Sequence, residues 1–270
     1  MPELPEVQTV VDTLRPHVEG RVLLGVTLHR EDFGTPIGHD WSILAGLRVL
    51  SLHRRAKRIV FSLEGGDRFY GHLGMTGRMT FEPADAEVKK HTHATLAFDG
   101  GEVRCVDSRR FGGLVWLGSS DDGARLGPEP LTMRSQQLAD RLLRTRRPLK
   151  SALLDQTFVA GLGNIYVDEA LFAAGLHPLT ACCDVDRPTA GRLSRAIKLT
   201  LNKAIRHKGS TLRDYVDAAG NKGGFQKLHR VYDRAGAPCR RCRTAIERFV
   251  LGGRSTHFCP RCQPALTIDA

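Results

Sequence analysis

The sequence predicts a multidomain α+β fold, in which an N-terminal antiparallel β-sandwich with a leading α-helix precedes a helical domain and a small metal-binding ribbon. Three observations predict this order. Apolar residues alternate with period two over residues 21–118, helical spacing returns after residue 135, and two Cys-x-x-Cys pairs stand near the C-terminus. At 270 residues, the chain is long enough for two domains and one small module.

Residues 5–15 are predicted to form the leading helix. Pro5 suits a first helical turn, where its missing N–H would have no partner in any case. Pro16 is expected to end the helix. The apolar stripe at helical spacing consists of Val7, Val10, Val11 and Leu14. Such a stripe would hold the extreme N-terminus against a core.

Residues 21–118 contain several short runs with the alternation of strands. One run, over 94–106, is predicted to be a hairpin that turns at Asp99-Gly100-Gly101. The alternating apolar positions of two further runs are Val22, Leu24, Val26 and Leu28, and then Ile59, Phe61 and Leu63 before Gly65-Gly66. Short strands separated by glycine turns are typical of an antiparallel sandwich.

The second half of the chain is predicted to be helical. Residues 119–135 are polar, rich in Gly and Pro and without periodicity, which indicates a linker, and residues 218–226 are too glycine-rich for a regular element. Three helices are expected. The first starts with Leu138, Leu142 and Leu143, and the second is capped by Asn164 and ends at Gly175. The third has the apolar stripe Leu193, Ile197, Leu201 and Ile205. We therefore expect domains over 1–118, 136–232 and 233–270.

The composition is that of a basic globular protein. Lys and Arg total 40 against 29 Asp and Glu, which gives a net charge of +11 and a pI near 9.7. Such a balance attracts a polyanion through counterion release. The first ten residues, MPELPEVQTV, lack the pattern of a signal peptide, and no later run approaches 18 apolar residues. We expect a cytoplasmic, soluble protein without a membrane partner.

Four of the seven cysteines have the spacing of a zinc site. Sixteen residues separate the pair Cys239 and Cys242 from the pair Cys259 and Cys262, and each pair can present two sulfurs to one tetrahedral ion. Four thiolates leave no open coordination position, so one structural Zn²⁺ is expected. The alternative is a set of free or redox-active thiols.

The arginines around these cysteines would make the ribbon a basic hairpin that is suited to phosphates. They are Arg240, Arg241, Arg243, Arg248, Arg254 and Arg261. The other cysteines, Cys105, Cys182 and Cys183, have no such spacing and are expected to be buried thiols or incidental surface residues.

The N-terminus has the residues of an amine nucleophile. A small residue at position 2 permits removal of Met1, which would leave Pro2 as a secondary amine with a pKa of about 7.7–8.0, well below the roughly 10.4 of lysine. Such an amine can attack a sugar C1′ and form an iminium. Glu3 can move protons, and Glu6 can fix the terminus. The alternative is ordinary helix-capping chemistry at this end.

Seven motifs together resemble the formamidopyrimidine-DNA glycosylase family (Fpg or MutM). They are PELPEV at 2–7, RRAKR at 54–58, HLGMTG at 72–77, DSRRFGG at 107–113, LGPEPL at 126–131, GLGNIYVDEALF at 161–172 and GGRSTHFCPRCQ at 252–263. The resemblance implies a β-sandwich, a helix–two-turns–helix domain and a zinc ribbon. It also implies a bifunctional glycosylase and AP lyase that excises 8-oxoguanine and formamidopyrimidines from double-stranded DNA through a proline iminium and β,δ-elimination.

The resemblance also assigns roles to individual residues. Pro2 would be the nucleophile and Glu3 the principal acid and base. Lys57 and His72 would bind phosphates beside the lesion, and Lys57 is counted among the catalytic residues. From charge patterning alone, Lys57 belongs to a solvated basic run and His72 is a strand-end histidine. Further DNA contacts implied by the resemblance are His91, Asn164, Tyr232 and Arg254.

A flipped base leaves a void in the duplex that must be filled. The resemblance assigns Met75, Arg109 and Phe111 to this void, with Arg109 bonded to the orphaned cytosine. The alternative for Met75 and Phe111 is core packing on strands. Residues 218–226 resemble the family's mobile loop over the extruded purine, with an ordinary flexible loop as the alternative.

Three positions depart from the family pattern. Gln8 stands where Glu is common, Ser108 replaces the usual Pro before the paired arginines, and Arg243 replaces a Gly after the second zinc cysteine. Two rival functions stay open: an endonuclease VIII-like glycosylase for oxidised pyrimidines, and a non-enzymatic zinc-ribbon DNA-binding protein. A chain that contacts duplex DNA through two domains is expected to be a monomer.

Overall fold

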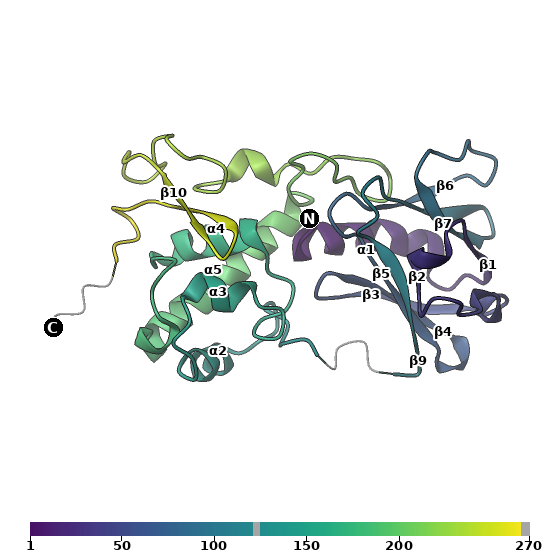
Figure 1. The fold of residues 1–270 in the computed structure, drawn as a ribbon, viewed down its shortest axis with the longest axis horizontal. Helices are drawn as coiled ribbons and strands as arrows, with labels where there is room; N and C mark the ends of the chain where they lie inside the picture. The colour runs from purple at the N-terminus through teal and green to yellow at the C-terminus, as the bar shows by residue number, and fades with distance from the viewer. Residues whose placement is uncertain (121–124, 266–270) are drawn as a thin grey trace. The chain divides into compact units, whose positions relative to one another are not determined.

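The computed structural model describes residues 1–120 and 125–265, which form two compact units (Figure 1). Of these residues, 1–120 and 207–226 belong to the first unit, and 125–206 and 227–265 belong to the second. Part of the expected linker, residues 121–124, and the last five residues of the expected ribbon domain lie outside the described residues. No helix within the described ranges has both the length and the apolar character that crossing a bilayer requires.

The first unit is a two-sheet sandwich. One sheet has the order β1 (Leu23–Leu28), β7 (Thr92–Phe98), β8 (Gly101–Val106) and β6 (Arg78–Glu82). The other has the order β2 (Gly34–Thr35), β9 (Gly113–Gly118), β5 (Arg68–His72), β4 (Arg58–Leu63) and β3 (Val49–Arg55). All pairs are antiparallel except β2 with β9. The predicted hairpin forms between β7 and β8, with its turn at Asp99 and Gly100.

Side chains from both sheets fill one core. Ile59 and Phe61 of β4, Val103 of β8 and Leu23 of β1 are all fully buried in it, and the rings of Phe61 and Phe69 stack at 4.5 Å. Leu24 is 57% exposed, because the register shifts between Leu23 and Gly25 and turns that side chain outward. The simple alternation predicted through Leu24 is therefore wrong at this one position.

Helix α1 (Leu4–Val18) leads the sandwich and buries its entire predicted stripe, Val7, Val10, Val11 and Leu14. The prediction that Pro16 ends the helix is wrong, because α1 continues to Val18. Proline removes only the single hydrogen bond that its own N–H would donate to the carbonyl four residues earlier. The fully buried Val18 offsets that loss at the last turn.

The second unit contains α2 (Ser135–Leu142), α3 (Leu149–Leu154), α4 (Asn164–Ala174), α5 (Arg187–Arg206), β10 (Glu247–Leu251) and β11 (Arg254–Phe258). Helix α3 was not predicted, because six residues are too few to show a helical period. Leu143 lies just beyond α2 and is exposed. Gly175 ends α4 in the left-handed region as predicted, and Leu193, Ile197 and Leu201 are buried on α5.

Five short 3₁₀ helices complete the described elements. They are η1 (Glu31–Phe33), η2 (Trp41–Leu44), η3 (Glu64–Gly66), η4 (Cys182–Asp184) and η5 (Phe225–Leu228). The β-sandwich, the helical part and the hairpin of β10 with β11 follow each other along the chain in the expected order.

Residues 207–226 group with the sandwich, whereas the sequence placed them in the helical domain. Two long-range hydrogen bonds show why. The N–H of Ser210 donates to Glu6 Oε1 at 2.7 Å, and the N–H of Phe81 donates to the carbonyl of Ala218 at 3.0 Å. Both contacts join this segment to elements that precede it by more than 100 residues, so no local pattern reports them.

Candidate active site and nucleic-acid interface

Two buried carboxylates stand at the start of α1. The N–H of Glu3 donates to Glu6 Oε2 at 2.8 Å, so Glu6 reaches back over the first turn. The second oxygen of Glu6 accepts the N–H of Ser210, and Gly209 packs so closely that a Cβ there would lie 2.6 Å from Glu6 Oε1. Glu6 therefore fixes the chain terminus against residues 207–226.

Four charged side chains act on the amine at the chain terminus. Burial lowers the pKa of the Met1 amine below its ordinary value of 8.0. Glu3 and Glu6 act in the opposite direction, while the positive charges of Lys57 and Arg109 lower the pKa further. A lowered pKa leaves more of the amine unprotonated and nucleophilic at neutral pH. Removal of Met1 would transfer the amine to Pro2, which is buried.

Lys57, His72 and His91 lie on three separate loops or strand ends of the first unit. Lys57 occupies the tight turn between β3 and β4. His72 ends β5, where burial first and the charge of Arg58 second lower its pKa, against the opposing effect of Asp107. His72 is therefore neutral at pH 7 and can donate one hydrogen bond. His91 is exposed just before β7, and its carbonyl accepts the N–H of Asp107 at 3.0 Å.

Met75 and Phe111 are surface residues on loops. Met75 lies between β5 and β6 and is 45% exposed, and Phe111 lies between β8 and β9 and is 51% exposed. The alternative that both are core residues on strands is therefore wrong. Arg109 extends over Phe111, with its Cζ 4.9 Å from the ring centroid. Two apolar side chains and one arginine are thus available to a partner.

Residues 207–226 form a hydrogen-bonded loop in this structure. Thr211 Oγ1 accepts the N–H of Gly223 and donates to the carbonyl of Tyr215, both at 2.9 Å. The Gly224 N–H donates to the carbonyl of His207 at 2.8 Å. Gly223 is required for close approach, since a Cβ there would lie 2.4 Å from the carbonyl oxygen of Gly209. The glycine richness of this segment thus permits backbone-to-backbone contact.

The four predicted zinc ligands converge. Their sulfurs all lie within 4.8 Å of one another, with 3.4 Å between Cys242 and Cys259 and 3.9 Å between Cys239 and Cys262. Zn–S bonds of about 2.3 Å in a tetrahedron separate sulfurs by about 3.8 Å, so these residues fit one ion. The predicted structural zinc site is confirmed, and it leaves no coordination position for substrate.

Two of the remaining three cysteines are buried thiols. Cys105 and Cys182 are buried, and burial raises the pKa of Cys105 to about 12 and that of Cys182 to about 11. The expectation of buried thiols is confirmed for these two. The arginines of the ribbon, by contrast, are all exposed.

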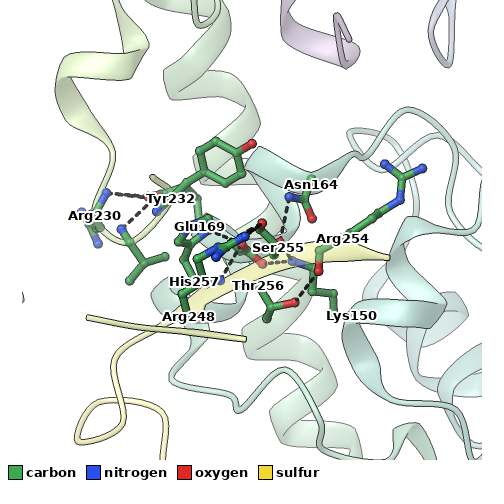
Figure 2. Close-up of polar contacts among 12 residues, drawn as sticks. Lys150, Asn164, Glu169, Arg230, Tyr232, Arg248, Arg254, Ser255, Thr256 and His257 are labelled. Carbon is green, nitrogen blue, oxygen red and sulfur yellow. Dashed lines mark hydrogen bonds and ion pairs between the residues drawn. The ribbon is translucent and has the colours of Figure 1, made fainter. Parts of the chain in front are cut away.

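Three predicted DNA contacts lie in the second unit (Figure 2). Asn164 is the first residue of α4 and not its cap, since Gly163 holds that position. Its Nδ2 instead donates to the Ser255 carbonyl at 2.9 Å, which ties the helix start to β11. Arg254 begins β11 beside this contact and is exposed. Tyr232 packs edge-on against His257, with ring centroids 5.1 Å apart.

Two consecutive acidic residues of α4 organise this region, and the sequence analysis missed both. Asp168 accepts Lys150 Nζ at 2.6 Å and the N–H of His257 at 2.9 Å. Glu169 Oε1 accepts the N–H groups of Val231 and Tyr232, both at 2.9 Å. The sequence did contain a signal for them, since two acids interrupt the otherwise apolar run VDEALF. Carboxylates buried in such a run require hydrogen-bond or ion-pair partners.

Lys150 completes this arrangement. Its Nζ also donates to the Ser255 carbonyl at 2.8 Å, the same oxygen that Asn164 binds (Figure 2). Burial raises the pKa of Glu169, although its backbone N–H partners act against this. The buried carboxylates thus connect α4 to β11 on one side and to residues 230–232 on the other.

Two departures from the expected motifs have local structural consequences. Gln8 Oε1 accepts Arg54 Nε at 2.9 Å and so holds the start of the basic run at 54–58. Arg243 has φ +68, which lies in the left-handed region that favours glycine. The ribbon therefore carries a strained backbone position beside its second zinc ligand.

Family models match most of the chain in three consecutive parts. Residues 1–114 match the formamidopyrimidine-DNA glycosylase N-terminal domain, residues 126–216 match the H2TH domain of the same enzymes, and residues 236–265 match a zinc finger found in FPG and IleRS. The predicted fold class, with its helix–two-turns–helix part, is confirmed.

Curated proteins and solved structures agree with these models. A formamidopyrimidine-DNA glycosylase of Gluconobacter oxydans is 46% identical, with 97% of this chain and 100% of that protein covered. The crystal structure of MutM (Fpg) from Thermus thermophilus is 42% identical, with a TM-score of 0.87 and coverage of 97% and 98%. A Lactococcus lactis Fpg mutant in complex with DNA containing Fapy-dG is 32% identical, with a TM-score of 0.90 and coverage of 98% and 100%.

Proposed function

The chain belongs to the formamidopyrimidine-DNA glycosylase family, and from this premise we propose that it is a bifunctional glycosylase and AP lyase for oxidised purines in duplex DNA. The observation that carries the proposal is the N-terminal amine. With Met1 in place, burial lowers the pKa of this amine, and Glu3, Glu6, Lys57 and Arg109 all act on it. Removal of Met1 leaves the amine on Pro2, the buried neighbour of Glu3. A solely DNA-binding protein would have no use for such a terminus.

The first step is displacement of the base. After Met1 is removed, the Pro2 nitrogen attacks C1′ of the extruded nucleotide, and the glycosidic bond breaks with its electron pair on the departing base. Glu3 passes the proton of the ammonium to the departing base, and it then takes up a second proton from solvent and delivers it to O4′. Opening of the sugar ring leaves an iminium between the Pro2 nitrogen and C1′. Glu6 keeps Pro2 in position through its bonds to the Glu3 and Ser210 amides.

Strand cleavage follows from the iminium. It acidifies the C2′ hydrogen, and the electrons of that C–H bond expel the 3′-phosphate as a C2′–C3′ double bond forms. A second elimination releases the 5′-phosphate, and water then frees Pro2. The iminium accepts the electrons, so the zinc supplies structure to the ribbon and takes no part in these steps.

The exposed groups of the first unit suit the extruded state of the duplex. Met75 and Phe111 can enter the stack, and Arg109 can hydrogen-bond the orphaned cytosine. Lys57 and neutral His72 bind phosphates at the lesion, and His91, Asn164, Tyr232 and Arg254 bind the DNA elsewhere. Solved relatives from Lactococcus lactis contain DNA with Fapy-dG or an abasic site, and a solved MutM structure contains DNA with carbocyclic 8-oxo-G. The Fapy-dG and 8-oxo-G complexes support a damaged purine as the substrate. We propose that the enzyme acts as a cytoplasmic monomer.

Defined duplexes test the substrate class. We expect single-turnover cleavage of 8-oxoguanine opposite cytosine to exceed that of thymine glycol opposite adenine by at least about tenfold, which corresponds to about 1.4 kcal/mol of transition-state discrimination. The reverse order would place the chain with the endonuclease VIII-like rival. A variant that retains Met1 should lose strand cleavage on both duplexes, and full activity in that variant would contradict the proline mechanism.

A further inference from the structure

A buried carboxylate lies behind the exposed residues Met75, Arg109 and Phe111. Asp107 directly follows β8 and is 1% exposed. Within residues 1–120 and 125–265, no basic side chain forms an ion pair with it, and its four hydrogen-bond donors are all neutral. A charge without a counterion in the interior must be stabilised by such donors. The four neutral donors therefore have to offset the cost of burying this charge.

The two carboxylate oxygens divide their contacts between two loops. Oδ1 accepts the hydroxyl of Thr76 and the N–H of Arg109, the latter at 3.1 Å. Oδ2 accepts the N–H groups of Phe111 at 2.8 Å and Gly112 at 2.7 Å. Thr76 is the neighbour of Met75, so one side chain holds the loop of Met75 and the loop of Arg109 and Phe111 together.

The main chain of Asp107 adds a third segment. Its carbonyl oxygen lies 2.7 Å from His93 Nε2, and its N–H donates to the carbonyl of His91 at 3.0 Å. His91 is itself a predicted DNA contact. Burial raises the pKa of Asp107, but the hydrogen bonds from Thr76 and from the loop amides together hold it below its ordinary value. The carboxylate is therefore ionised at neutral pH, the state in which it can accept all four bonds.

Backbone packing closes the same junction from the other side. Gly74 has φ +54, and a Cβ there would lie 2.3 Å from the carbonyl carbon of Phe111. The two loops thus touch backbone to backbone. Ser108, which replaces the family's usual proline, is exposed and contributes no ring to stiffen the loop. Asp107 holds this loop through the N–H groups of Arg109, Phe111 and Gly112.

We propose that Asp107 is a positioning residue that holds Met75, Arg109 and Phe111 in one arrangement, so that the three enter the duplex as a unit when a base is extruded. The inference rests on the proposed function and specifies which step Asp107 supports. It serves extrusion of a paired base, and it does not serve the attack of Pro2 on C1′. A preformed abasic site has no base to extrude, so cleavage there should depend little on Asp107.

The test compares Thr76→Val, which removes one donor at nearly constant volume, with Thr76→Ser, which keeps the hydroxyl. Thr27→Val is the matched control, because Thr27 is exposed on β1. We expect Thr76→Val to slow 8-oxoguanine excision from duplex DNA about tenfold, with cleavage of a preformed abasic site changed less than about threefold. Thr76→Ser and the control should match wild type. Asp107→Asn should show the same split between substrates, with a larger loss on 8-oxoguanine.

Fluorescence of 2-aminopurine beside the lesion reports base unstacking directly. Its rise on binding should be slower in Thr76→Val than in wild type, which a general loss of folded protein would not produce. Equal losses on 8-oxoguanine and abasic DNA, or excision at the wild-type rate, would overturn the role of Asp107. Wild-type protein that cleaves neither substrate would instead overturn the proposed function.

Discussion

Asp107 in the sandwich and Asp168 in the helical unit are both fully buried carboxylates that organise predicted DNA contacts, yet their partners differ in charge. Asp107 is held by the Thr76 hydroxyl and by backbone amides. Asp168 forms an ion pair with Lys150, and the side chains of both are 0% exposed. The neutral donors can be removed one at a time at modest cost, whereas loss of Lys150 leaves a buried charge unpaired.

Because their partners differ, mutations near the two carboxylates should have different consequences. Changes around Asp107 should alter activity more than folding, because the loop residues it holds are exposed and contribute little to the core. Changes around Asp168 should alter folding first, because α4, α3 and β11 all pack at that point.

Loss of zinc should have the largest effect and should be confined to the second unit. Cys259→Ser removes one of four ligands, and structural zinc contributes about 10–16 kcal/mol of folding free energy in zinc-finger peptides. We expect amide hydrogen exchange to lose its protection over 236–265, while residues 92–106 of the sandwich stay protected. Intact protection of the ribbon in metal-free protein would show that its fold does not depend on the ion.

Lys150→Met should destabilise the protein by about 3–5 kcal/mol, since it leaves Asp168 buried without its ion-pair partner. The free energy of unfolding in urea, measured on zinc-loaded protein, checks this. The double variant Lys150→Met with Asp168→Asn removes both charges and should recover at least half of the loss. A single variant as stable as wild type would show that the ion pair does not stabilise this unit.

Thr76→Val should lower stability by about 1 kcal/mol at neutral pH, which is the usual net contribution of one buried hydrogen bond. The folded pKa of Asp107 is below its ordinary value of 3.8. The stabilisation is therefore present above about pH 4 and is lost as pH falls toward the folded pKa. Unfolding of wild type and variant at pH 6, 4 and 3 should show their difference shrink, and a difference that grows in acid would contradict this assignment.

Arg243→Gly should have the smallest effect and the opposite sign. Relief of the left-handed φ should stabilise the zinc-loaded protein by about 1 kcal/mol. Thermal unfolding with zinc in excess measures this, with Arg240→Gly as a control in the same knuckle. A destabilised Arg243→Gly would mean that the arginine makes a contact that outweighs its backbone strain.

Local patterns predicted the elements, while long-range contacts set the details. The apolar stripe of α1 and the alternation of Ile59, Phe61 and Leu63 were readable, because burial on one face imposes the period of the element. Two other contacts, between Thr76 and Asp107 and between Lys150 and Asp168, join residues that are far apart in the chain. The periodicity within a single element does not predict such contacts. The roles of Pro2, Met75 and the other site residues stay predictions that came from matched motifs, and the structure supplies their surroundings.

In the proposed mechanism, a free Pro2 amine bonds covalently to deoxyribose. Borohydride reduction during turnover of an 8-oxoguanine duplex, followed by proteolysis and mass spectrometry, locates that bond directly. We expect one trapped sugar on an N-terminal peptide that begins at Pro2. A trapped sugar on Lys57 or another lysine, or rapid nicking by protein that still carries Met1, would contradict it.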